Sequence, residues 1–287
     1  MTEFVKLVEC PRDAMQGWKE FIPTHTKISY LQGLLNVGFD TLDAGSFVSH
    51  SAIPQMADTA TVFRSLDLSE TKTKLLCIVA NERGAKEATG FEAVHSIGFP
   101  FSISETFQMR NTNSSIAESF IRLQKIADIC QATGKELVVY ISMGFGNPYD
   151  DPYSPTIVID WAHKLVSLGV KTISLADTVG LATEQQVLQS TADLIRVLPD
   201  TEIGVHLHSS PSNWKAKLDA ALIAGCRRID GALKGIGGCP MAGDDLVGNM
   251  DMELMIGYLD DRKLIHGLNK EALDQSLRMA AQIFHTV

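Results

Sequence analysis

Residues 203–210, IGVHLHSS, are the most informative stretch of the chain, because they place two histidines at the end of a short run of strand-forming residues. Side chains two positions apart in a β-strand point to the same face, so His206 and His208 are expected to project together. Paired imidazoles are common ligands of divalent metals. Two unrelated histidines, one of them hydrogen-bonded in a core, are the alternative interpretation of this stretch.

Apolar runs of strand composition recur on either side of this stretch. They lie at residues 5–10, 41–43, 74–79, 93–98, 137–143, 172–175, 203–208 and 228–233. Between most of them the apolar residues follow helical spacing, as at Ile28, Leu31, Leu34 and Leu35. Glycines typical of helix ends precede several of the runs, at Gly38, Gly134, Gly169 and Gly225. This alternation predicts an α/β protein with a closed (β/α)8 TIM barrel.

An open, doubly wound sheet is the competing fold. A dinucleotide-binding version would carry a glycine-rich fingerprint after its first strand. Residues 11–17 read PRDAMQG there, which is not that fingerprint. We therefore expect a single TIM-barrel domain over residues 1–287, with the barrel at about 5–255 and an additional C-terminal helical segment at about 256–287.

Composition and charge narrow the class of protein. The net charge of −9 argues against broad nucleic-acid binding, which needs a basic face. No apolar run is long enough to cross a bilayer, and the first residues, MTEFVKLVEC, do not resemble a leader. The five cysteines are scattered without a CxxC pair, as is typical of reduced thiols. We expect a cytoplasmic protein with a small-molecule partner, no nucleic acid, no membrane and possibly a homodimer.

Polar residues follow the predicted strands at the end where such barrels carry their active sites. They are Arg12 and Asp13 after the first strand, Asp43 and Ser46 at the second, Asp177 and Thr178 at the sixth, His206 and His208 at the seventh, and the loop GIGGCP with Asn249 after the eighth. Singly, each has a plain structural explanation: Arg12–Asp13 fits a surface ion pair, and Asp177 or Thr183 fits a helix N-cap. Their convergence on one face favours a metal-dependent enzyme, because a cation or an anionic ligand would offset the cost of burying them.

Several segments resemble one family. VECPRDAMQ (8–16), SFVSHSAIPQMAD (46–58), SLADTVG (174–180), VHLHS (205–209) and GIGGCPMAGDDLVGN (235–249) are similar, in this order and spacing, to the 3-hydroxy-3-methylglutaryl-CoA lyases. These belong to the DRE-TIM metallolyase superfamily. The glycine-rich loop around Cys239 is the most specific of the segments, whereas the two histidines alone would identify only the superfamily.

The resemblance implies a carbon–carbon lyase that cleaves this acyl-CoA to acetyl-CoA and acetoacetate. Its divalent metal, Mg or Mn more than Zn, would be held by Asp13, His206, His208 and Asn249. The catalytic residues implied are Arg12 for the enolate oxygen, Asp13 or His206 as the base, Asp43, Asp177, and Cys239 as the proton carrier. Positions implied around the substrate or coenzyme A are Gln16, Lys19, Ser46, Asn111, Tyr149, Ser174 and Thr178.

The chain also departs from the family pattern. Cys10 stands where the family usually has Gly, Ala14 replaces another Gly, and Asp43 is one methylene shorter than the usual Glu. Ser209 replaces an Asp after the second histidine, and one extra residue separates Cys239 from Asn249. Two alternatives therefore stay open: another aldolase or Claisen-type metallolyase acting on a related hydroxyacyl-CoA or hydroxy acid, and a non-catalytic metal-binding relative.

Overall fold

A closed barrel of parallel strands forms the centre of the molecule. The computed structural model describes residues 4–238 and 247–284. Within them the strands pair in chain order, and β1 pairs with both β2 and β8 to close the barrel. The strands are β1 (Lys6–Glu9), β2 (Thr41–Ser46), β3 (Lys74–Ile78), β4 (Val94–Ser102), β5 (Glu136–Ser142), β6 (Thr172–Ala176), β7 (Glu202–His206) and β8 (Arg228–Gly231).

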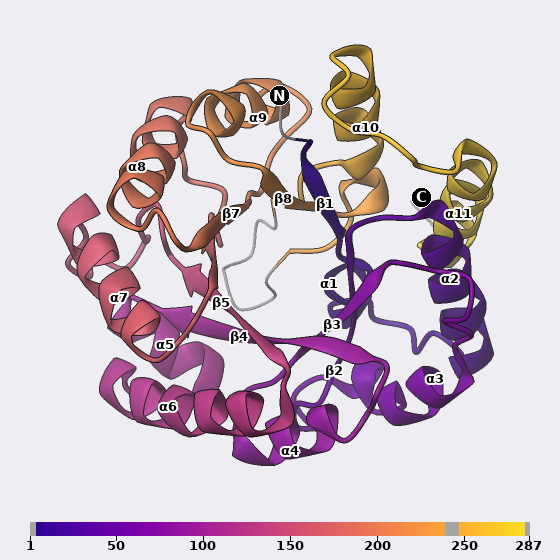
Figure 1. The fold of residues 1–287 in the computed structure, drawn as a ribbon, viewed down its shortest axis with the longest axis horizontal. Coiled ribbons are helices and arrows are strands. Elements are labelled where there is room, and N and C mark those ends of the chain that lie inside the picture. Colours follow the sequence, from indigo (N-terminus) through magenta and orange to yellow (C-terminus); the bar gives the residue numbers. More distant parts are fainter. Residues whose placement is uncertain (1–3, 239–246, 285–287) are drawn as a thin grey trace.

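Helices surround the barrel, which Figure 1 shows from one end. They are α1 (Pro11–Gln16), α2 (Thr24–Val37), α3 (Thr59–Ser65), α4 (Glu82–Thr89), α5 (Glu105–Thr112), α6 (Ile116–Thr133), α7 (Pro155–Ser167), α8 (Glu184–Val197), α9 (Trp214–Ile223), α10 (Met252–Asp261) and α11 (Lys270–Ile283), with short 3-10 turns at η1 (Pro54–Met56) and η2 (Leu233–Gly235). None of the described helices is long and apolar enough to span a membrane.

The predicted (β/α)8 barrel and its C-terminal helical segment are confirmed. The boundaries differ in places. The run predicted at 41–43 continues to Ser46, and β7 ends at His206 instead of His208. His208 lies beyond the strand, in an isolated bridge with Asn249. The two histidines therefore come together through a strand end and the loop that follows, and not through one continuous strand.

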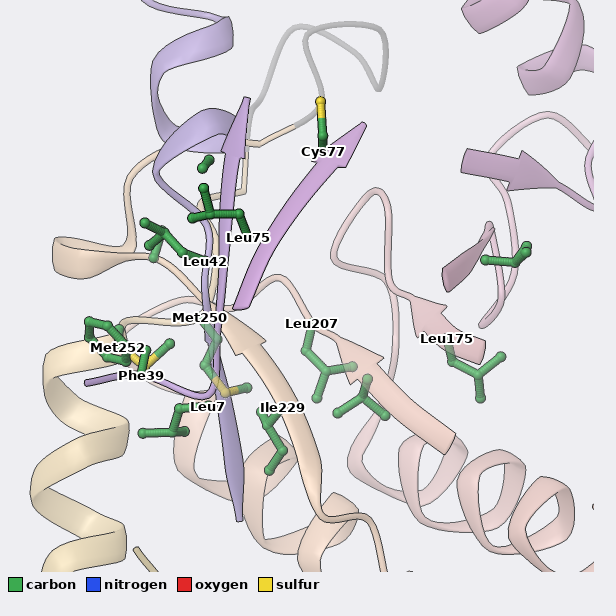
Figure 2. Packing of buried hydrophobic residues seen from close by; sticks show 14 of the residues in the cluster. Leu7, Phe39, Leu42, Leu75, Cys77, Leu175, Leu207, Ile229, Met250 and Met252 are labelled. Carbon is green, nitrogen blue, oxygen red and sulfur yellow. The ribbon is translucent and has the colours of Figure 1, made fainter. Parts of the chain in front are cut away.

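The apolar core lies mainly between the strands and the helices. Figure 2 shows Leu7 of β1 beside Ile229 of β8, two residues that are also paired in register. Inside the barrel a smaller cluster joins Leu76, Ile78 and Val138 with Tyr140. The barrel interior is otherwise partly polar, and this polar part leads into the site described next.

Candidate active site

A cavity of about 700 Å³ opens at the carboxyl ends of the strands. Arg12, Asp13, Asp43, His206 and His208 all line it. They come from the start of α1, from β2 and from the end of β7 with its following loop. The barrel thus brings together residues that are widely separated along the chain.

Asp13, His206 and His208 form a group suited to a metal ion. Their ligand atoms lie within 4.8 Å of one another. Asn249 adjoins them, because its Nδ2 donates to Asp13 Oδ2 at 2.7 Å, while its Oδ1 is buried without a partner among the described residues. A carboxylate, two imidazoles and a free amide oxygen are the donors that Mg²⁺ or Mn²⁺ accept in proteins. These residues fit a divalent cation; this donor set does not fix which one.

The backbone around this group explains its position. Asn249 is held beside His208 by bonds from Ser209 N to Gly248 O and from Met250 N to Leu207 O, both 3.0 Å. Gly237 packs against it with φ +98°, where a Cβ would lie only 2.7 Å from Asn249 Nδ2. Only glycine combines this conformation with such a close approach.

Arg12 connects Asp13, a member of this group of possible metal ligands, to Asp43. Its Nη1 donates to Asp13 Oδ1 at 3.0 Å and to Gln16 Oε1 at 2.8 Å, and its Nε donates to Asp43 Oδ2 at 3.0 Å. Although burial opposes a charge here, the two carboxylates raise the pKa of Arg12, which stays a cation. Burial would raise the pKa of Asp13, but the charges of Arg12 and His206 and the hydrogen bond from Asn249 together outweigh it, and the pKa is lowered. Burial raises the pKa of Asp43 despite Arg12.

The two histidines have opposite electrostatic surroundings. Burial would lower the pKa of His206, but Asp230, whose Oδ2 lies 3.3 Å from its Nδ1, raises it. Burial, followed by the charge of His206, lowers the pKa of His208 to about 4. His208 is therefore neutral near pH 7, the form in which an imidazole binds a metal.

Only some of the other predicted site residues line the cavity. Gln16, Asn111 and Thr178 do. The residues outside its lining are Lys19, which is exposed, Ser46 and Ser174, which are buried, Tyr149, which faces Arg110, and Asp177, which pairs with Lys217. Thr183, not Asp177, caps the helix after β6. Cys239 lies outside the described residues. The roles of all these residues stay predictions.

Sequence reasoning missed other residues at the site. Asp230 is buried beside His206, with which it is aligned in the β7–β8 register. Tyr140, Arg110 and Arg122 line the cavity from β5, α5 and α6. Only the barrel register could have revealed Asp230, and basic residues on helices resemble an ordinary solvated face.

Comparison with known proteins gives consistent results. The HMGL-like family model matches residues 5–280. The chain is 33% identical over 272 residues to the mitochondrial hydroxymethylglutaryl-CoA lyase of Mus musculus, covering 94% of this chain and 82% of the relative. It is 32% identical over 271 residues to the cytoplasmic 3-hydroxy-3-methylglutaryl-CoA lyase of Danio rerio, covering 93% and 78%.

The fold is similar to that of a solved HMG-CoA lyase from Acinetobacter baumannii in complex with coenzyme A and 3-methylmalate. The TM-score is 0.91 at 27% sequence identity, covering 99% of this chain and 92% of that one. The HMG-CoA lyase of Pseudomonas aeruginosa gives a TM-score of 0.91 at 28% identity, covering 99% and 94%.

Proposed function

This chain belongs to the HMGL-like family, and the relatives described above are named as lyases. We propose that it is a metal-dependent lyase that cleaves 3-hydroxy-3-methylglutaryl-CoA to acetyl-CoA and acetoacetate. One observation carries the proposal. Asp13 uses Oδ1 for Arg12 and Oδ2 for Asn249, so the cation group and the guanidinium are fixed beside each other in one cavity. A hydroxyl to be deprotonated and a carbonyl that becomes an enolate need these two groups side by side.

A bound Mg²⁺ or Mn²⁺ would supply charge that lowers the pKa of the substrate's tertiary hydroxyl. The hydroxyl proton then passes to Asp13 or His206. As the O–H bond breaks, its electrons form the ketone of acetoacetate, and the C2–C3 bond electrons pass to the thioester as an enolate.

Arg12 meets the developing enolate oxygen. A guanidinium has five N–H donors. Four are used in the bonds of Arg12 to Asp13, Gln16 and Asp43, which leaves one N–H of Nη2 without a partner among the described residues. A charge held this rigidly needs no reorganisation as the enolate forms. Cys239 would return a proton to the enolate carbon, which completes acetyl-CoA.

The outer part of the cavity suits the coenzyme. Arg110 and Arg122 line it, and neither forms an ion pair with a described residue. Guanidinium groups bind phosphate well. We place the phosphates of the coenzyme A portion against these two arginines, with the acyl group directed inward to Arg12.

A related acyl-CoA is the second candidate substrate. The replacement of the family's Asp by Ser209, whose backbone is bonded to Gly248 beside Asn249, changes the surroundings of the second histidine. Loss of a carboxylate at this point can alter either metal support or acyl recognition.

An assay with three thioesters separates the two candidates. They are 3-hydroxy-3-methylglutaryl-CoA, 3-hydroxyglutaryl-CoA without the methyl group, and 3-hydroxy-3-methylbutyryl-CoA without the distal carboxylate. With Mg²⁺ or Mn²⁺ present, acetyl-CoA release should be fastest from the first. A higher kcat/KM on either analogue would assign a different substrate, and no release from any of them would reject the lyase proposal.

Location and assembly are part of the proposal. Similar proteins include both a mitochondrial and a cytoplasmic enzyme. We propose a cytoplasmic location and a homodimer, to be tested by cell fractionation and by light scattering of the purified protein.

A further inference from the structure

A second group of metal-type side chains adjoins the first. Ligand atoms of Cys10, His206 and Asp230 lie within 4.8 Å of one another. His206 belongs to both groups, with Asp13 and His208 in one and Cys10 and Asp230 in the other. The lyase chemistry proposed above makes no use of Cys10.

The backbone holds Cys10 firmly in this position. Cys10 follows directly after β1, and its N–H donates to Gly231 O of β8 at 2.9 Å. Pro11 comes next and fixes the start of α1. Cys10 is 1% exposed, so its thiol cannot reach solvent without unpacking the barrel.

Two buried polar atoms beside this group have no partner among the described residues. They are Asp230 Oδ1 and Tyr140 Oη. Asp230 is 1% exposed, and its other oxygen faces His206 Nδ1. The Tyr140 ring stands edge-on to His206, with centroids 6.0 Å apart. A buried carboxylate oxygen without a donor is costly, and a bound cation would remove that cost.

The charges around Cys10 also favour a cation. Asp230 shares this group with Cys10, and Asp13 lies in the adjoining group around His206. Carboxylates on both sides of the shared imidazole attract a divalent ion. The ion would release the thiol proton to water as the sulfur–metal bond forms.

We propose that Cys10, His206 and Asp230 form a second divalent-cation site, selective for zinc, that competes with the site at the barrel mouth for His206. A thiolate, an imidazole and a carboxylate suit Zn²⁺, whereas the oxygen-rich first group suits Mg²⁺ or Mn²⁺. Zinc would then inhibit the enzyme by withdrawing His206. The two groups share His206 whatever the substrate of the enzyme is.

Cobalt(II) absorption tests the proposal without an activity assay. Only a thiolate ligand gives a sulfur-to-cobalt charge-transfer band in the near ultraviolet, so the first group alone gives none. We expect the band when Co²⁺ is added to metal-stripped wild type, its loss in Cys10→Ser, and its retention in Cys239→Ser. One equivalent of Zn²⁺ should remove the band, whereas excess Mg²⁺ should not.

Several results would overturn the site. They are the absence of the band in wild type at saturating Co²⁺, its persistence in Cys10→Ser, and its loss in Cys239→Ser. If Cys10→Ser does not fold, Asp230→Asn serves instead and should weaken Zn²⁺ binding by more than about tenfold. Bound Mn²⁺, followed by electron paramagnetic resonance, should leave as Zn²⁺ is added. Simultaneous binding of both ions would refute the competition for His206.

Discussion

Asp13 connects Arg12 to the cation group through hydrogen bonds. One of its oxygens accepts from Arg12 and Gln16, and the other accepts from Asn249. Asp13 therefore holds the guanidinium of Arg12 and the amide of Asn249 beside each other. Because one carboxylate accepts from both sides, the positive guanidinium can lie beside a group that binds a cation.

Arg12→Gln tests the enolate role. We expect turnover to fall about 10²–10³-fold, which is the scale of a lost oxyanion donor. Among the described residues no other cation pairs with Asp43, so none stands in the place of Arg12 to stabilise the enolate. Manganese affinity should stay within about twofold of wild type, and circular dichroism should show an intact fold. Activity within about twofold of wild type would mean that Arg12 does not meet the enolate.

Glu9→Gln tests how a buried carboxyl outside the cavity makes the free energy of unfolding depend on pH. Burial raises the pKa of Glu9 well above its usual range, and one of its oxygens has no partner among the described residues. Above the ordinary glutamate pKa of about 4.3, the unfolded chain loses this proton before the folded chain does. The free energy of unfolding therefore falls as pH rises, until the folded-state pKa is reached.

The glutamine variant lacks this titration. Urea unfolding at about pH 5 and about pH 8 should show Glu9→Gln gaining stability relative to wild type at the higher pH. Glu87→Gln, at an exposed position on α4, is the control and should track wild type. Parallel pH profiles for wild type and Glu9→Gln would show that Glu9 titrates normally.

At this scale the sequence predicted the cation group better than its surroundings. The spacing of His206 and His208 and the position of Asp13 after a strand were visible as patterns. Asp230 was not, because its contact with His206 depends on how β7 and β8 align. The predicted substrate positions Lys19 and Tyr149 lie outside the cavity lining, since helix and loop directions are not encoded in a local motif.

Residues 236–238 and 247–250, which lie between β8 and α10, complete the cation group. Gly237 packs against Asp13 and Asn249, and a backbone bridge pairs Asn249 with His208. This part of the site thus depends on a glycine conformation at one position and on a backbone bridge at another.

Gly237→Ala tests this element. The new Cβ would lie 2.7 Å from Asn249 Nδ2 and 2.9 Å from Asp13 O, in a backbone region that disfavours alanine. We expect manganese affinity, measured by calorimetry, to fall by more than about tenfold. Gly257→Ala on α10 is the matched control, because no described atom beyond its neighbours and the backbone of its own helix lies within 4 Å of an added Cβ, and alanine favours a helix by about 0.5–1 kcal/mol. Equal affinity in both variants would contradict the assigned packing.

Helix α9 is tied to the ends of β6 and β7 through Lys217. Its Nζ donates to Asp177 Oδ2 at 2.7 Å and to His208 O at 2.8 Å. Both side chains of the ion pair are 2% exposed. Lys217→Met should lower the free energy of unfolding by about 3–5 kcal/mol, because Asp177 would keep a buried charge without its partner. The double variant with Asp177→Asn should recover part of this loss; a single variant as stable as wild type would refute the coupling.

At the scale of elements, the sequence located the strands and missed some of their ends. Hydrophobic runs and terminating glycines, such as Gly38 with φ +85°, marked the alternation. Ser46 was placed at the end of the second strand by its polar side chain, and β2 does end there, although the apolar run stopped at Asp43. The break after His206 was not visible, because it depends on the bridge between His208 and Asn249.

Closure of the barrel is what makes the site possible. Asp13 and Asn249 are 236 positions apart, yet they share a hydrogen bond because β1 pairs directly with β8. The closed topology could be predicted from strand count, and it placed the polar strand ends on one face. The position of Cys10 and Asp230 inside the barrel could not be predicted, because it depends on which side chains of each strand point into the barrel.

Manganese binding tests the central claim most directly. Metal-stripped wild type and His208→Ala would be titrated with Mn²⁺, and free ion would be measured by electron paramagnetic resonance. We predict one ion per wild-type chain and an affinity more than about tenfold weaker in His208→Ala. No binding by the wild type, or equal affinity in the two proteins, would contradict a cation held at the mouth of the barrel.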